Sequence, residues 1–533
     1  MKIKKHFLWL FSILILSIIT ANPVFAKTSE KEFVIHISDD IPLMHPQVAN
    51  SVVSAQILTG LCEGLFVYDP YTCKPVPALA ESWTENGKTW KFQIRKNAKF
   101  ENGDLITAHT IQTAWLNILD PKVNYPFASL LDCIKGAQNY RLGKNKDKNS
   151  VAINVENDFT LIVTLTVPTQ HFAKILCHHA FSAVHPTQLD DGKKHLGKYV
   201  LKNSKNAFIP ISNGPFKVET YNKDLIKFVK NPKYWDKDSV ELDVILIKMN
   251  MKPDDITDAF NRGEIHWTNS SANINDIVGY NTIQYSPGFS TEYLFFKVEE
   301  SPLNNAEFRK ALLLAIPYKE LRKGYLLPAS TLIFPLIGYP KIKGIEEYNK
   351  PQAKQIIEKL NLNEKDKTVK IKFPDTSYHK ELANILKNAW TEIGLQVELD
   401  FVNYSKYYPS IQKSGYHLAT MTWVGDFADP IAFLELFKKS SGLNDSKWKN
   451  DDFEKLIMKA NSEYKQKERY ELLAEAEQIL LDSSVIIPIS HSPSINIIDL
   501  STLSGWYSNP LNIHPFKFIK FVPPKMLPGI VKR

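Results

Sequence analysis

Two carboxylates in the last fifth of the chain have the type and spacing to do chemistry. Residues 422–430 read TWVGDFADP, so Asp426 and Asp429 follow an alternating run over 416–421. A strand that ends in a small residue and an acid is a common way to present a carboxylate at a sheet edge. Asp426 is therefore a candidate for holding a charged ligand. Alternatively, either acid could cap a helix that begins near Pro430, because Asp is frequent at helix starts.

Other chemical signatures are weak or missing. Four histidines lie within 15 residues: His171, His178, His179 and His185. The first two could share a helix face, but no carboxylate completes a ligand shell, so packing and surface roles are favoured over a metal site. The chain contains no phosphate-binding glycine loop, nucleophile elbow or paired-His metalloprotease helix. The sequence thus predicts no metal and no cofactor, although counting residues alone does not exclude a catalytic triad.

A block of alternating strands and helices must position Asp426. We predict strands at 369–373, 395–401 and 416–423, separated by helices at 378–393 and 406–413. Such a block forms a doubly wound parallel sheet, because each right-handed crossover returns the chain beside the previous strand. Ligands collect outside the carboxyl ends of such strands. His379, Tyr404 and the group at 423–426 follow the three strands, so we expect them on one edge of the sheet.

The amino-terminal segment is typical of a secretory signal peptide. Three lysines within the first five residues precede an apolar run over 7–19, and the pattern Val24-Phe25-Ala26 favours cleavage after Ala26. The run is shorter than the roughly 20 residues of a membrane span, although a retained signal anchor is the alternative. No Cys follows the cleavage site, which disfavours a lipid anchor. We therefore expect an exported protein.

Composition limits the function classes. The full chain has 533 residues and a net charge of +8. Cleavage of the 26-residue signal peptide, which carries three lysines, leaves 507 residues with a net charge of +5. That length predicts two or three domains. Lysines are scattered among acids, which argues against a nucleic-acid partner. The four cysteines suit an oxidising compartment. Cys62 could pair with Cys73 and Cys133 with Cys177, but four free buried thiols are an equal alternative.

Motifs throughout the chain resemble family 5 of the extracellular solute-binding proteins, the receptors of peptide and nickel ABC importers. The motifs are LCEGLFVYD (61–69), PALAESW (77–83), WKFQIRKNAKFENGDLITA (90–108), NGPFKV (213–218), NPKYWD (231–236), RGEI (262–265), FRKALLLAI (308–316) and TWVGDFADP (422–430). The resemblance runs from about residue 33 to residue 520. It implies an α/β fold of the periplasmic-binding-protein type, in which two lobes of three domains are joined by a hinge around a ligand cleft.

The resemblance also implies a domain order and a function. The expected segments are 1–26 as signal peptide, 27–70, 191–292 and 489–533 as domain I, 71–190 as domain II, and 293–488 as domain III, the second lobe. The implied role is a monomeric periplasmic receptor, not an enzyme, that delivers short peptides to permease subunits of an ABC importer in the inner membrane. A receptor for dipeptides, murein tripeptide or a metal chelate is the alternative, and a secreted peptidase is less favoured.

The family pattern assigns residues to the amino end of a bound peptide. In oligopeptide binders an aspartate in the motif at 423–427 receives the α-ammonium of the peptide, and Asp426 occupies that place. The resemblance places further residues around the peptide: Trp423 and Tyr404 from domain III, Phe127 from domain II, and Asn269, Ser270 and Ser290, which would offer backbone.

The carboxylate end departs from the family pattern. His379 matches a family histidine that can approach the carboxylate of the ligand. Ile411 and Thr420, however, stand where close relatives carry arginine, and Val424 stands where they carry a cysteine. Arg322 or Lys323 is the other candidate cation. Without a bidentate arginine, we expect the carboxylate to be held less firmly or a different peptide length to be preferred.

Overall fold

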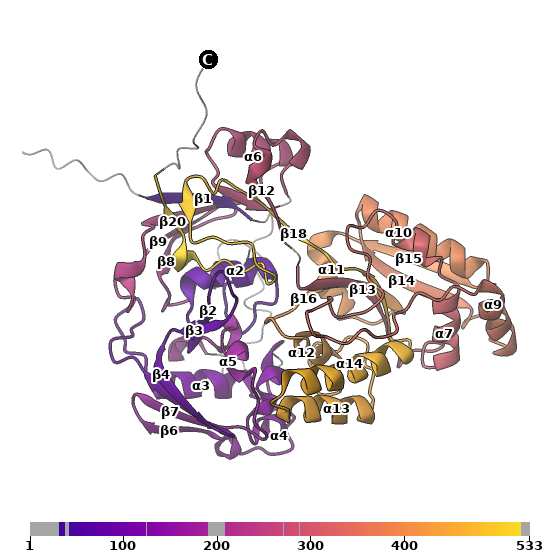
Figure 1. The fold of residues 1–533 in the computed structure, drawn as a ribbon, viewed down its shortest axis with the longest axis horizontal. Coiled ribbons are helices and arrows are strands. Elements are labelled where there is room, and N and C mark those ends of the chain that lie inside the picture. Colours follow the sequence, from indigo (N-terminus) through magenta and orange to yellow (C-terminus); the bar gives the residue numbers. More distant parts are fainter. Residues whose placement is uncertain are drawn as a thin grey trace, which may run out of the picture.

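The protein has a mixed α/β fold built on three main sheets (Figure 1). The structure, a computed structural model, describes residues 31–37, 42–123, 125–189, 208–269, 271–286 and 288–523. The expected signal peptide and Ser270 lie outside the described residues. Within the described part, no helix is both long enough and apolar enough to cross a membrane.

A seven-stranded sheet contains strands from both ends of the described chain. Its order is β12-β18-β11-β1-β10-β9-β8. The strands are β1 (Glu32–His36), β8 (Phe216–Tyr221), β9 (Leu225–Lys230), β10 (Val244–Lys248), β11 (Trp267–Asn269), β12 (Ile283–Ser286) and β18 (Ser494–Ile498). Helices α2 (Val52–Leu61) and α6 (Pro253–Asn261) accompany it. Phe516 and Ile519 of the carboxyl-terminal segment pack in one core with Phe33 and Leu61, so the tail returns to the first part of the chain.

A four-stranded antiparallel sheet forms the next layer, in the order β4-β5-β7-β6. Its strands are β4 (Ala80–Asn86), β5 (Thr89–Ile94), β6 (Ile153–Asn157) and β7 (Thr160–Thr164), with helices α3 (Ala108–Ile118), η1 (Ala128–Cys133), α4 (Ala137–Arg141), α5 (Phe172–Ile175) and η3 (His179–Phe181). Trp115 anchors α3, because its buried indole nitrogen donates to the carbonyl of Phe181 at 3.0 Å. Two small ribbons pair β2 (Phe66–Tyr68) with β3 (Pro75–Pro77) and β19 (Leu503–Ser504) with β20 (Lys520–Phe521).

The five-stranded sheet has the order β15-β14-β16-β13-β17. Its strands are β13 (Ser290–Phe296), β14 (Thr368–Pro374), β15 (Gln396–Val402), β16 (Leu418–Val424) and β17 (Ile486–Ser490), with α10 (Ser377–Thr391) and α11 (Tyr404–Ile411) as crossovers. Strand β14 is parallel to both β15 and β16, which confirms the predicted doubly wound unit. Strand β13 is antiparallel to β16 and β17. The start of β13 therefore lies at the same edge as the carboxyl ends of β14, β15 and β16.

Local sequence explains this unit. Val369, Ile371 and Phe373 alternate into the core from β14, and Leu382 and Leu386 of α10 pack in the same core at helical spacing. Helix α10 begins where the Thr376 hydroxyl accepts from the amide of His379 at 3.1 Å, which is the usual capping bond. These two elements fix the end of β14 and the first turn of α10, where His379 lies.

The remaining helices complete the part around the five-stranded sheet. They are α7 (Ala306–Leu314), α8 (Tyr318–Leu321), α9 (Lys350–Lys359), α12 (Ile431–Leu434), η10 (Glu435–Phe437), α13 (Asp451–Ser462) and α14 (Gln466–Asp482). Short 3-10 turns elsewhere are η2 (Lys148–Ser150), η4 (Pro186–Gln188), η7 (Lys237–Ser239), η8 (Ile274–Asp276), η9 (Tyr280–Thr282) and η11 (Phe516–Phe518).

The chain passes between the two groups of sheets twice, from β12 to β13 and from β17 to β18. We call the described residues up to 286 and from 494 the first lobe, and residues 290–490 the second lobe (Figure 1). The two crossing segments touch: the Ser290 hydroxyl donates to the carbonyl of Ser492 at 2.7 Å. A Cβ on Gly288 would lie 2.3 Å from the same carbonyl oxygen, so only glycine fits there.

Candidate functional site

Asp426 lies at the junction of the two lobes, directly after β16. The amide of Gly425 donates to the carbonyl of Phe289 at 2.8 Å, and a Cβ on Gly425 would lie 2.4 Å from the Phe289 ring. Glycine therefore lets the end of β16 pass close to the start of β13. On the other side, the Tyr68 hydroxyl of the first lobe donates to the carbonyl of Asp426 at 2.7 Å. Both lobes thus fix the backbone that carries this carboxylate.

The carboxylate of Asp426 is buried without a cation. Its side chain is 10% exposed, and Oδ1 lies 3.6 Å from Nε2 of His178. Burial lowers the pKa of His178 to about 3, so this imidazole is neutral. Burial also raises the pKa of Asp426 well above its ordinary value. Among the described residues, no Lys or Arg forms an ion pair with it, and a buried carboxylate in that state is costly.

Asp429 is satisfied within the protein, in contrast to Asp426. Arg469 donates to both of its carboxylate oxygens, at 2.7 and 3.0 Å, and Lys174 of the first lobe lies 3.4 Å away. Burial alone would raise the pKa of Asp429, but Arg469, His171 and Lys174 together outweigh burial and lower it. Its Oδ1 also accepts from the amide of Ile431 at 3.2 Å. Of the two acids, Asp429 thus bonds the first amide of α12, although the N-cap residue of this helix is Pro430.

His178 is a site residue that the sequence did not identify. Its Nδ1 accepts from the amide of Ala180 at 3.2 Å, which leaves the proton of the neutral ring on Nε2, facing Asp426. Phe127, which the resemblance placed beside the ligand, is 3% exposed and packs on His178 with ring centroids 4.3 Å apart. Phe127 thus helps to hold the His178 ring in place by packing against it. No local signal in the sequence distinguishes His178 from its neighbour His179.

The other histidines of the segment have separate partners. The ring of His179 contacts the carbonyl of Pro46 at 2.8 Å, and His185 contacts Asp104 at 2.8 Å. His171 stacks on Phe427, with ring centroids 5.7 Å apart. In the part of the chain that the structure describes, no group of three or more His, Cys, Asp or Glu could hold a metal ion. All four cysteines are free thiols.

Trp423 and Tyr404 lie at the predicted edge of the five-stranded sheet. Trp423 is the second-last residue of β16, and its indole nitrogen donates to the carbonyl of Ala432 at 3.2 Å, so the ring packs on α12. Tyr404 opens α11 and is 56% exposed. The exposed ring of Tyr404 is available to a ligand at this edge, whereas Trp423 offers the part of its ring that α12 leaves uncovered.

His379 lies at the same edge, but it faces a carboxylate of the protein. Its Nδ1 contacts the Thr376 hydroxyl at 2.7 Å, and its Nε2 lies 3.6 Å from Oε1 of Glu292 on β13. The other oxygen, Oε2, accepts from the Tyr378 hydroxyl at 2.5 Å and from the Ser490 hydroxyl at 3.4 Å. A ligand carboxylate that approached His379 would therefore meet the charge of Glu292, a residue that the sequence did not identify.

The other candidate cations do not replace an arginine there. The Arg322 guanidinium is buried and donates to the carbonyls of Ile345 and Pro488 at 2.7 and 2.8 Å. Burial lowers its pKa to about 10, so it remains a cation that joins the segment at Ile345 to β17. Lys323 is exposed on the surface. Arg322 thus has a structural role.

The family model named "Bacterial extracellular solute-binding proteins, family 5 Middle" matches residues 74–445. The chain belongs to this family. It is 30% identical to the dipeptide-binding protein DppE of Bacillus subtilis over 486 residues, which cover 87% of each chain. It is also 30% identical to the oligopeptide-binding protein OppA of Bacillus subtilis over 475 residues, with 84% and 85% of the two chains covered.

A solved relative confirms the expected fold class. The structure of Haemophilus influenzae OppA in complex with RPPGFSPFR matches with a TM-score of 0.80 at 21% identity. The match covers 93% of this chain and 99% of that chain. The α/β architecture of the periplasmic-binding-protein type, expected from the motifs, is therefore correct.

Asn269 and Ser290 of this family 5 protein use their side chains to hold the first lobe and the crossing segments. The Asn269 amide donates to the carbonyl of Ile37 at 2.7 Å, and its oxygen accepts from the amide of Ser271 at 3.1 Å. The Ser290 hydroxyl is bonded to Ser492. These side-chain bonds are made within the protein, and a contact of either residue with a ligand stays a prediction.

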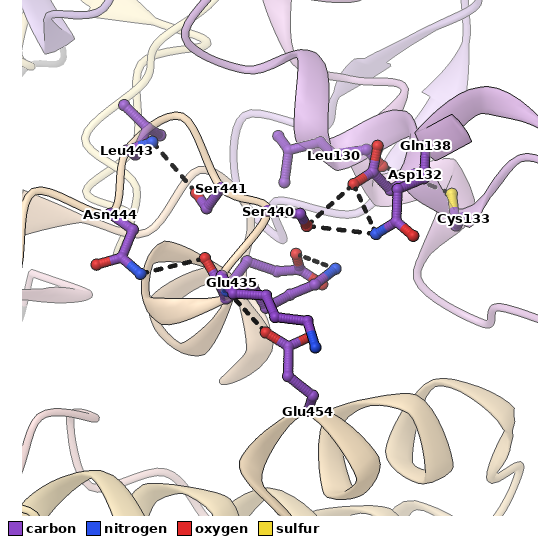
Figure 2. Close-up of polar contacts among 12 residues, drawn as sticks. Leu130, Asp132, Cys133, Gln138, Glu435, Ser440, Ser441, Leu443, Asn444 and Glu454 are labelled. Carbon is purple, nitrogen blue, oxygen red and sulfur yellow. Dashed lines mark hydrogen bonds and ion pairs between the residues drawn. The ribbon is translucent and has the colours of Figure 1, made fainter. Parts of the chain in front are cut away.

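The lobes of the solute-binding protein also touch beyond Asp426 (Figure 2). The Asp132 carboxylate accepts from the Ser440 hydroxyl at 3.3 Å, and Gln138 donates to the same hydroxyl at 3.3 Å. Arg141 pairs with Asp132 at 2.6 Å and donates to the carbonyl of Ser440 at 2.8 Å. In addition, the Gln170 amide donates to the carbonyl of Tyr464 at 2.6 Å. These bonds hold the two lobes together.

Proposed function

We propose that this protein is the periplasmic receptor of an ABC importer and binds short peptides, with the α-ammonium of the peptide on Asp426. The observation that carries the proposal is the buried carboxylate of Asp426, which lies between the lobes and pairs with no Lys or Arg among the described residues. A ligand ammonium would form a charge-assisted hydrogen bond there and offset the cost of burial. The names of the relatives, a dipeptide-binding and an oligopeptide-binding protein, support the same ligand class.

The contacts of the site suggest how binding and closure are coupled. His178 and Tyr68 reach Asp426 from the first lobe, while Asp426 itself belongs to the second lobe. A ligand that neutralises Asp426 therefore favours the state in which the lobes meet. The peptide would lie extended and bond through its backbone as an added strand, with side chains in hydrated pockets. Such a binding mode is selective for a free amino terminus and tolerates many different side chains.

The remaining parts of the proposal follow from family membership and sequence. The protein would be exported by cleavage after Ala26, act as a monomer without a cofactor or catalytic activity, and deliver peptides to permease subunits in the inner membrane. Domain I would comprise 27–70, 191–292 and 489–533, domain II 71–190, and domain III 293–488. The two segments that cross between the lobes would then form the hinge. Dipeptides and murein tripeptide also carry an ammonium, whereas a metal chelate offers none for Asp426.

Isothermal titration calorimetry with defined tri- to pentapeptides tests this function. We expect binding of peptides with a free amino terminus, and a loss of roughly 100-fold or more after Asp426→Asn or after acetylation of the peptide amine, because breaking a buried pair costs about 3–5 kcal/mol. Asp451→Asn is the matched control, since its side chain is 81% exposed on the surface. Unchanged affinity after both changes to the amine pair would disprove the anchor.

A further inference from the structure

A second carboxylate lies at the same sheet edge as Asp426. Glu292 on β13 pairs with Thr422 on β16, and Asp426 follows Thr422 by four residues. Strand β16 ends at Val424, so at ~3.3 Å per extended residue Asp426 lies up to ~13 Å from Glu292 along the strand direction. An extended peptide whose ammonium binds Asp426 would cover that distance with about four residues.

Glu292 accepts its short hydrogen bonds from hydroxyl groups. Its side chain is 8% exposed, and its Oε2 accepts from Tyr378 and Ser490. Its Oε1 makes only the longer contact of 3.6 Å to His379. Among the described residues, no Lys or Arg forms an ion pair with Glu292. A carboxylate has about four lone-pair directions, so Oε1 retains capacity for a strong donor.

Tyrosines surround this carboxylate. The hydroxyls of Tyr325 and Tyr378 are bonded to each other, and Tyr378 is 38% exposed. Burial raises the pKa values of Tyr325, Tyr378 and Tyr408, and the charge of Glu292 raises each of them further. Tyr404 and Tyr408, on the first turns of α11, are 56% and 40% exposed. Aromatic faces around a carboxylate suit a cationic side chain with an apolar stem.

The same arrangement disfavours an anion. His379 is engaged on both ring nitrogens, by Thr376 and by Glu292. A peptide carboxylate placed at His379 would lie within a few ångströms of Glu292, and like charges at that distance repel strongly where water is excluded. A peptide that reaches Glu292 with a basic side chain meets an attraction instead.

We propose that Glu292, together with Tyr378, forms a cation subsite that selects peptides with a Lys or Arg side chain near the fourth residue. The proposal rests on the proposed function, because Asp426 sets the register of the peptide. It names the substrate class: short basic peptides held at two points, by the α-ammonium and by one basic side chain.

Calorimetry with matched pentapeptides tests the subsite. One series of alanine pentapeptides places Lys, norleucine or Glu at position 3, 4 or 5, so that charge changes while the aliphatic stem is kept. For the wild-type protein we expect the best Lys peptide to bind about 10- to 100-fold more tightly than its norleucine analogue, as for a charge-assisted bond, and the Glu peptide to bind most weakly. The wild-type series needs no mutant to be interpreted.

The variant Glu292→Gln then assigns the preference to this carboxylate. In Glu292→Gln we expect the Lys and norleucine peptides to bind with equal affinity, while the affinity for the norleucine peptide changes by less than about threefold. Tyr378→Phe should reduce the ratio of the two affinities by a smaller factor. If pentaalanine binds through Asp426 but no position prefers Lys, the subsite is refuted and the proposed function stands. If pentaalanine and all other peptides fail to bind, the proposed function itself is refuted. A Lys preference that persists in Glu292→Gln would also overturn the assignment.

Discussion

Peptide affinity should depend on pH through Asp426. In the ligand-free protein, burial raises the pKa of this carboxyl above its ordinary value of 3.8. A bound ammonium favours the ionised form, so the complex holds Asp426 with a lower pKa than the free protein. The free protein therefore binds more protons than the complex. It follows that affinity increases as pH rises from about 4 and levels off above the pKa of the free protein.

The magnitude is set by the gap between the two pKa values. Each unit of that gap changes the affinity by tenfold, about 1.4 kcal/mol. At higher pH a second limit applies, since the α-amino group of a peptide titrates near about 8. We thus expect a bell-shaped profile whose acidic limb belongs to Asp426 and whose basic limb belongs to the ligand.

Calorimetry from pH 4.5 to pH 8.5, in two buffers of different ionisation enthalpy, measures the affinity and the protons released. Near the pKa of free Asp426, binding should release up to one proton. Asp426→Asn should abolish the acidic limb and the proton release but leave the basic limb. A wild-type profile that is flat below neutrality, or that tightens on acidification, would refute an ammonium–carboxylate anchor at this position.

Three further predictions concern stability and closure. Burial raises the pKa of Glu477 from 4.5 to about 7, so the folded protein binds this proton more tightly than the unfolded chain does. The free energy of unfolding should therefore fall by about 3 kcal/mol between pH 5 and pH 8. Glu477→Gln should remove that fall in urea titrations, and an unchanged slope would contradict it. Arg469→Met should lower the free energy of unfolding by about 3–5 kcal/mol, because it leaves Asp429 buried and unpaired, and a loss below about 1 kcal/mol would argue against burial of the pair. Arg141→Ala removes the bond to the carbonyl of Ser440 and the ion pair with Asp132, so peptide dissociation in stopped-flow experiments should accelerate at least about fivefold. An unaltered dissociation rate would mean that these contacts do not hold the lobes closed.

Periodicity in the sequence was enough to predict the part of the fold that carries the site. The alternation of strands and helices over 369–423 predicted a parallel unit, and β14, β15 and β16 form it with bounds that differ by one or two residues. The edge position of Asp426, Tyr404 and His379 followed from that topology alone. Local pattern was sufficient here because each crossover is short.

The residues that sequence reasoning missed act through contacts distant in the chain. Glu292 lies at the start of β13, and its partner Tyr378 is 86 residues away. His178 meets Asp426 only because the two lobes come together, and its neighbour His179 turns to Pro46. Spacing cannot distinguish such partners, because it describes one element at a time. Asp429 is paired and Asp426 is not because Arg469 of α14 lies beside Asp429, which the sequence alone does not show.

The unpaired carboxylate of Asp426 explains why ligand charge should control closure. Among the described residues, neither Asp426 nor Glu292 forms an ion pair with Lys or Arg, whereas Asp429 pairs with Arg469. A buried unpaired carboxylate disfavours the closed arrangement of the lobes, since an open arrangement would hydrate Asp426. A ligand shifts the equilibrium only by its differential affinity for the two states. His178 and Tyr68 contact Asp426 from the first lobe, so an ammonium on Asp426 contributes to that difference. Tyr378, His379 and Ser490 around Glu292 belong to the second lobe, so a basic side chain there adds affinity without favouring closure.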